Sequence, residues 1–169
     1  MKWIGALLVC ATGLGIGMGL HRRLEKRIAF LTCAETLIRR IGESIRYTAA
    51  PVGDTLAALA NGSEFGDFSL LSDTVAGLAP DGEFRYAWHT AVSAHAARWE
   101  LTQRETAVLY RYADGLGVSD VSGEMRHSER CAQELHDCIL ARREDMGRRG
   151  RLYPILGVCM ASATALLLL

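Results

Sequence analysis

The chain has 169 residues, of which 50% are hydrophobic, and its 19 basic residues balance its 19 acidic residues. This length suits one domain of ordinary size, and the lack of a basic excess argues against a protein that binds nucleic acid over a broad surface. The 5 cysteines form no CxxC pair and their number is odd, which argues against a disulfide framework and favours reduced, buried thiols.

An apolar segment opens the chain, because residues 3–20 carry no charged side chain. As a helix, these residues would extend over about 27 Å, close to the bilayer's hydrocarbon thickness of about 30 Å. We therefore predict a transmembrane helix over residues 1–20. A cleaved signal peptide is the alternative, but its stronger positive charge would precede the apolar run, whereas here Arg22 and Arg23 follow it.

The first helix should continue beyond this segment. Apolar residues recur every three or four positions from Leu24 to Ile45, which is typical of a helix with one buried face. Pro51 disfavours helical geometry in the residue before it and suits the first turn of a new helix, so we expect the first helix to end near Tyr47. A short second helix carries Val52 and ends at the Asn61-Gly62 cap.

The middle of the chain also has the spacing of helices. Phe65–Leu78 is a moderately amphipathic segment, and Ala79-Pro80-Asp81-Gly82 after it predicts a loop. An alanine-rich helix is expected over Tyr86–Trp99. No segment alternates with a period of two over a length that would indicate a strand, so the pattern favours an all-α fold.

Two more helices complete a predicted bundle of about six. Thr102–Glu105 has the pattern of a capping box and opens a helix that Gly115 or Gly117 closes. The last long helix starts near Val121, carries an apolar face as far as Met146, and runs into the second apolar end. The first and last helices are therefore expected to pair in antiparallel fashion, with both ends of the chain returning to one bilayer.

The C-terminal residues 152–169 carry no charged side chain, and we predict a second transmembrane helix there. Residues 21–151 then form the domain between the two spans. Basic residues close to a span stay on the cytoplasmic side, and they lie between the spans at both ends. This predicts a cytoplasmic domain with both termini on the opposite side of the membrane, and the residues that set this topology are Arg22, Arg23, Arg148, Arg149 and Arg151.

Small residues are spaced along both predicted spans in a way that suits close helix packing in a membrane. An equally acceptable interpretation is that glycine is simply common in transmembrane helices. The candidate packing residues are Gly13, Gly15, Gly17 and Gly19 in the first span, and Gly157 and Ala161 in the second.

The sequence offers no pattern typical of an enzyme. His127 and Cys131 have the i, i+4 spacing of metal ligands, but no second group of ligands accompanies them. No glycine-rich phosphate loop follows a strand, and carboxylates such as Glu35 stand in helical register with arginines such as Arg39. We therefore predict no catalytic residues, no metal, no cofactor and no small-molecule substrate.

A second hypothesis is a membrane-tethered DNA-binding regulator that uses residues 101–127. The segment Leu101–Glu105 resembles the opening of the helix-turn-helix domain of LuxR-type transcription regulators. However, the recognition helix should lie at Gly117–His127, and this region contains Arg126 as its only Lys or Arg. Contacts with DNA phosphates need several Lys and Arg side chains close together. Nucleic acid is therefore not a predicted partner.

A resemblance to a known family covers nearly the whole chain. The motifs that carry it are the glycine-rich start, Glu43-Ser44-Ile45-Arg46-Tyr47, Ala87-Trp88, Trp99 before Leu101-Thr102, Leu116-Gly117-Val118-Ser119-Asp120, His127, and Arg151-Leu152-Tyr153 before Leu156-Gly157-Val158. In their order and spacing, these motifs are similar to stage III sporulation protein AB of spore-forming bacteria. The chain departs from the family pattern at a turn, Ala49-Ala50-Pro51-Val52, and at Gly123-Glu124, which we expect to be a surface position.

The resemblance implies a fold and a function. The fold would be a cytoplasmic helical bundle similar to the F-type platform domain of type II secretion and type IV pilus systems. The function would be that of a non-enzymatic platform or scaffold in the channel complex that links mother cell and forespore during sporulation. The implied partners are the membrane, other proteins of the channel complex and a secretion-type ATPase, and the implied location is the mother-cell membrane that faces the forespore.

Overall fold

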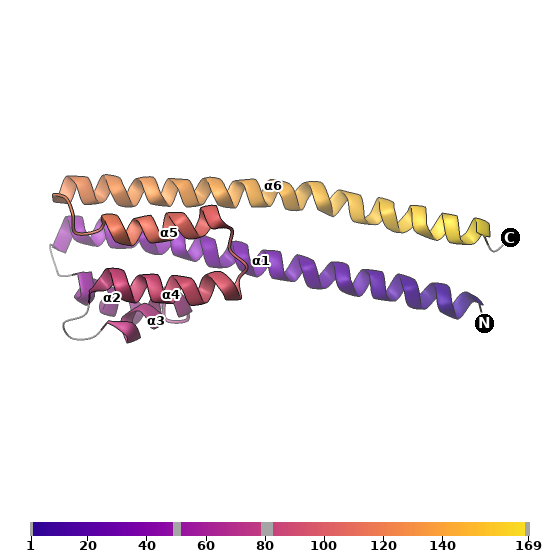
Figure 1. Cartoon of the computed structure of the whole chain (residues 1–169), viewed down its shortest axis with the longest axis horizontal. Helices are drawn as coiled ribbons and strands as arrows, with labels where there is room; N and C mark the ends of the chain where they lie inside the picture. The colour runs from indigo at the N-terminus through magenta and orange to yellow at the C-terminus, as the bar shows by residue number, and fades with distance from the viewer. Residues whose placement is uncertain (1, 49–51, 79–82, 168–169) are drawn as a thin grey trace. The chain divides into compact units, whose positions relative to one another are not determined.

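The computed structural model describes the backbone of residues 2–48, 52–78 and 83–167, and the side chains of residues 22–47, 52–78 and 83–147. Six α-helices form this part of the chain, and no strand occurs in it (Figure 1). They are α1 (Lys2–Thr48), α2 (Val52–Ala60), α3 (Ser69–Gly77), α4 (Phe84–Arg98), α5 (Gln103–Gly115) and α6 (Val121–Leu167). The prediction of an all-α fold with about six helices is confirmed.

The chain divides into two compact units. One consists of residues 1–28 and 140–169, and the other of residues 29–139. The predicted spans, 1–20 and 152–169, lie outside the residues whose side chains are described, as do the candidate packing residues within them. Within the residues that are described, no helix is both long enough and apolar enough to cross a membrane. The two spans and the limits 21–151 of the domain between them stay predictions.

Several helix boundaries agree with local sequence signals. Helix α1 ends at Thr48, one residue beyond the predicted Tyr47. At the start of α5, the Thr102 hydroxyl accepts a hydrogen bond from the Glu105 amide at 3.4 Å, and the Glu105 carboxylate accepts one from the Thr102 amide at 2.7 Å. This is the predicted capping box. The helix then ends at Gly115, one of the two glycines expected to close it.

The third helix is shorter than predicted. The amphipathic segment was expected from Phe65, but α3 begins at Ser69 and residues 61–67 form turns. Two glycines, Gly62 and Gly66, favour turns over helix here. Phe65 is nevertheless only 2% exposed, so it is a core residue that lies in a turn and not in a helix. The predicted loop at residues 79–82 lies outside the described residues, and α4 begins at Phe84, two residues before the predicted Tyr86.

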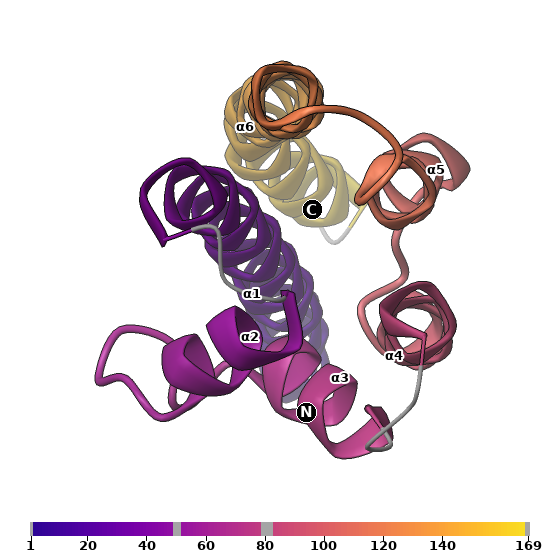
Figure 2. The ribbon, with the colours of Figure 1, turned by 90° about the vertical axis from the view of Figure 1, so that its left-hand side faces the viewer.

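Within the unit 29–139, the helices follow one another around a shared core (Figure 2). Contacts join α2 to α3, α3 to α4, and α4 to α5. The circle closes between α1 and α6, where Glu35 lies 3.3 Å from His136 and Gly42 packs against Ser128. Because the residue numbers rise along one helix as they fall along the other, α1 and α6 are antiparallel in this unit, as the sequence predicted.

The core of this unit combines aliphatic and aromatic side chains from all around the circle. Trp88 of α4 is fully buried and its indole N–H donates to the Leu109 carbonyl of α5 at 2.9 Å. Its ring also meets Tyr112 edge-on at a centroid distance of 5.5 Å. On α1 and α6, the largest fully buried residues are Leu31, Leu37, Ile38 and Ile41 of α1 and Leu135 and Ile139 of α6. The bundle is therefore a packed support for the side chains on its surface.

Candidate partner-binding surface

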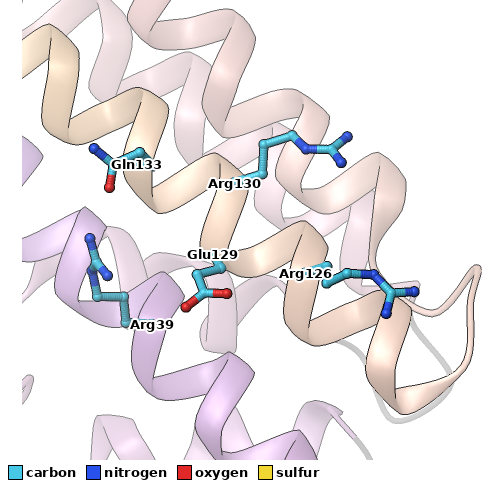
Figure 3. A pocket seen from close by; sticks show the side chains of 5 residues that line it. All are labelled: Arg39, Arg126, Glu129, Arg130 and Gln133. Carbon is cyan, nitrogen blue, oxygen red and sulfur yellow. The ribbon is translucent and has the colours of Figure 1, made fainter.

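A charged pocket lies on the surface between α1 and the first turns of α6 (Figure 3). It is open to solvent and has a volume of about 460 Å³. Five side chains line it, one from α1 and four from α6: Arg39, Arg126, Glu129, Arg130 and Gln133. Three guanidinium groups and one carboxylate give this pocket a positive balance, which suits an anionic group.

Glycine sets the closeness of the two helices that form the pocket. A Cβ atom at Gly42 would lie 2.9 Å from the Cβ of Ser128, so no larger residue fits without a shift of the helices. The Glu35 carboxylate also lies 3.0 Å from the Arg39 guanidinium group of the same helix and 3.3 Å from the His136 ring of α6. The Glu35–Arg39 pair was anticipated from the sequence, and Glu35 also links the two helices.

The two arginines of α6 differ from most other arginines of the bundle. Arg40, Arg85 and Arg111 each lie within 4.0 Å of a carboxylate. Arg126 and Arg130 are exposed, and among the described residues neither has an ion pair or hydrogen bond. Two like charges at i, i+4 cost a helix about 0.2–0.5 kcal/mol, so this pair does not serve the stability of α6.

The side chains of Arg126 and Arg130 point in a different direction from that of Glu129, the acidic residue of the pocket (Figure 3). Figure 3 shows the guanidinium groups of Arg126 and Arg130 on one side of α6, while the Glu129 side chain points to the α1 side. The two arginines therefore present a local cationic face that is not neutralised within the described part of the chain. We call Arg126 and Arg130 the arginine face.

The turn that leads into α6 is fixed by side-chain hydrogen bonds. Glu124 accepts from the Ser119 amide at 2.9 Å and from the Ser119 hydroxyl at 3.2 Å, and the Asp120 carboxylate accepts from the Gly123 amide at 3.0 Å. Gly117 has a φ of 82°, which glycine adopts without strain. Glu124 is 5% exposed, so the expectation that it occupies a surface position was wrong. It is buried because its carboxylate closes this turn.

Below the turn, an aromatic pair locks α5 to α6. The His127 ring stacks on Tyr112 with an angle of 2° between the planes, and its Nε2 lies 3.1 Å from the Tyr112 carbonyl oxygen. A Cβ atom at Gly115 would lie 2.4 Å from this ring, so the glycine makes room for the histidine. His127, a residue of the family resemblance, therefore holds the α5–α6 hairpin together.

The thiol and phenol in this region are buried and neutral. Burial raises the pKa of the Cys131 thiol to about 11 and also raises the pKa of the Tyr112 phenol. Cys131 lies 3.8 Å from His127, a weak contact, and the described residues hold no group of three side chains that could bind a metal ion. These groups therefore support the helix packing and leave the arginine face as the candidate site.

The residues predicted to set topology are described only in part. Arg22 and Arg23 are exposed on α1, whereas Arg148, Arg149 and Arg151 lie outside the described side chains. The arginine face was not among the predicted sites. Its i, i+4 spacing is visible in the sequence, but the lack of a carboxylate partner becomes evident only from the packing.

Comparisons with known proteins give one family. A family model described as stage III sporulation protein AB matches residues 2–169, which is essentially the whole chain. Searches of the curated proteins and of the solved structures find no match. The match confirms the resemblance noted in the sequence and implies a role in sporulation. The chain belongs to the stage III sporulation protein AB family.

Proposed function

We propose that this chain is a non-enzymatic platform component of the channel complex between mother cell and forespore, held to the membrane at both ends. The observation that carries the proposal is the antiparallel pairing of α1 and α6, seen in the Glu35–His136 contact. Because of this pairing, the chain enters and leaves the unit 29–139 at the same end. That arrangement suits a domain whose two neighbouring segments both return to one bilayer.

The architecture of the bundle supports a scaffold. Its helices form a closed circle around an aromatic and aliphatic core, and its histidines engage in packing contacts. His95, 2% exposed, lies 2.9 Å from Asp73 and stacks on Phe30, while His127 stacks on Tyr112. A rigid domain of this kind holds a bound protein in a fixed relation to the membrane, as an F-type platform domain would.

The proposed location is the mother-cell membrane that faces the forespore, with residues 21–151 in the cytoplasm. Arg22 and Arg23 follow the first predicted span and are exposed, as expected of residues that face the aqueous side. The proposed partners are other proteins of the channel complex and a secretion-type ATPase. The arginine face offers such a partner an anchoring point for carboxylates.

Co-purification of the full-length chain from sporulating cells tests the proposal. After mild cross-linking and solubilisation, a tagged chain should retain the secretion-type ATPase and other membrane proteins of the channel complex. The same tag on an unrelated protein with two membrane spans serves as the control. A chain that is recovered intact without the ATPase and without any channel protein would contradict the platform role.

A further inference from the structure

The acidic residues of this chain are distributed unevenly. Between Tyr47 and Phe84 the sequence contains no Lys, Arg or His, whereas it contains the acidic residues Asp54, Glu64, Asp67, Asp73, Asp81 and Glu83. This stretch includes α2, α3 and the turns between them. Since the whole chain has no net charge, the remainder carries a matching basic excess. The molecule is therefore electrically polar.

Two of these carboxylates are free to meet a partner. Glu64 lies 3.4 Å from Arg40, and Asp73 lies 2.9 Å from His95. Asp54 on α2 and Asp67 in the turn before α3 are exposed, and among the described residues neither has an ion pair or hydrogen bond. We call Asp54 and Asp67 the acidic face.

The arginine face and the acidic face belong to opposite sides of the same unit. Seen end-on, α6 lies on one side of the unit 29–139, while α2 and α3 lie across the core from it (Figure 2). The first face presents two unpaired guanidinium groups and the second two unpaired carboxylates. Arginine and carboxylate form the strongest of the charged hydrogen bonds that side chains make.

We propose that copies of this chain associate head to tail, with the arginine face of one copy bound to the acidic face of the next. Complementary faces on opposite sides of one molecule give a heterologous contact, which repeats from copy to copy. Such a contact builds a ring where the rotation closes and an open array where it does not. Attachment to a membrane raises the effective concentration of neighbouring copies and so favours a contact that is weak in solution.

The chemistry of the pocket favours discrete carboxylates over a continuous polyanion. Glu129 borders the arginine face and would repel the evenly spaced phosphates of a nucleic acid. Arg126 and Arg130 are exposed, and their side chains extend from α6 away from Glu129, so individual carboxylates can approach them on that side (Figure 3). The acidic face of a second copy supplies two such groups.

The test is sedimentation equilibrium of the full-length chain in a non-ionic detergent. The native chain should self-associate, and less so at about 500 mM salt than at about 50 mM salt, because salt screens exposed charges. The double variants R126E/R130E and D54K/D67K should each lower the association constant about tenfold. The chain that carries all four substitutions, and an equimolar mixture of the two double variants, should both associate again.

Matched controls separate the charge effect from a loss of folding. Arg104 on α5 is also exposed and has no ion pair or hydrogen bond within the described residues, so R104E should behave like the native chain while R126E weakens association. Near-ultraviolet circular dichroism of each variant should match the native spectrum. Should a double variant misfold, the single variants R126E and D54K and their mixture give the same comparison.

The result is independent of the ATPase. The proposed platform role can fail in the co-purification while self-association persists, and the reverse can also occur. A native chain that stays monomeric, double variants that associate as the native chain does, or a fourfold variant without recovered association would each overturn the head-to-tail contact.

Discussion

Replacement of Gly115 by alanine should destabilise the bundle by forcing His127 out of its place. A methyl group at this position would lie 2.4 Å from the Cε1 and Nε2 atoms of the ring, well inside van der Waals contact. The ring cannot swing away freely, because it stacks on Tyr112 and its Nε2 lies 3.1 Å from the Tyr112 carbonyl oxygen. The substitution therefore has to disrupt the α5–α6 hairpin.

The magnitude follows from two costs and one gain. Overpacking of a filled site costs about 1–3 kcal/mol, and loss of the histidine hydrogen bond adds about 0.5–1.5 kcal/mol. Alanine in a helix gains up to about 1 kcal/mol over glycine. The free energy of unfolding should thus fall by about 0.5–3.5 kcal/mol. In Gly147→Ala, where nothing lies within 4 Å of the added methyl group, only the helical gain remains and stability should rise.

A double-mutant cycle tests the cause. Denaturant unfolding would be followed by near-ultraviolet circular dichroism, which reports the packing of buried Trp88 and Tyr112. H127A alone should be destabilising because it leaves a cavity and removes the contact with the Tyr112 carbonyl. In G115A/H127A the methyl group has room, so the double variant should be more stable than the sum of the single effects predicts, by about 1 kcal/mol or more. Strictly additive effects, or a G115A chain as stable as the native one, would refute the steric argument.

Three further predictions concern the cap, the buried thiol and the nucleic acid. T102A should lower the free energy of unfolding by about 1 kcal/mol in the same denaturant assay, because the capping box with Glu105 is lost, whereas T102S should restore it. Burial raises the pKa of the Cys131 thiol from its ordinary value of 9.0 to about 11, so the folded state binds the thiol proton more tightly than the unfolded state. The associated stability is complete below pH 9 and should decline toward pH 11, and C131A should flatten that decline in a pH series of unfolding curves. The full-length chain should not bind duplex DNA at about 50 mM salt in an anisotropy assay, because residues 101–127 contain too few Lys and Arg side chains to contact the phosphates. Tight binding in this assay would favour the regulator hypothesis.

Local signals were sufficient for much of the fold. The capping box at Thr102 fixes the start of α5 through contacts within a few residues, so the sequence alone predicts it, and the sequence narrows the end of α5 to Gly115 or Gly117. The end of α1 near Tyr47 follows in the same way from Pro51. The apolar spacing of α1 and α6 also identifies their buried faces, because the period of a helix is visible in any single stretch of sequence.

The errors arose where the tertiary environment decides. Glu124 is a charged residue and was therefore expected on the surface, yet its carboxylate accepts a hydrogen bond from the Ser119 amide and is buried in the turn. Phe65 opens the predicted amphipathic segment, yet it lies in a turn, where Gly62 and Gly66 flank it, and is buried there. In both cases a contact outside the local helical pattern determined the outcome.

The arginine face could not be predicted from the sequence, because the sequence does not show which arginines have a carboxylate partner. The spacing of Arg126 and Arg130 is evident, but their significance depends on which carboxylates reach them. Arg111 is also on the bundle surface and is neutralised by Glu134 at 2.9 Å, a partner from another helix. Only the packed structure distinguishes an arginine with such a partner from one without.

Attachment at both ends is best tested by the topology of the full-length chain produced in growing, non-sporulating cells, where the outer face of the cell membrane is open to the medium. Single cysteines introduced near each terminus and at Thr102, in a chain with its native cysteines replaced by alanine, would be labelled with a membrane-impermeant maleimide before and after the membrane is opened. Both terminal cysteines should react in these intact cells, and the cysteine at position 102 should react only after permeabilisation. A terminal cysteine that is protected in intact cells, or a chain that high salt releases from the membrane, would contradict attachment at both ends.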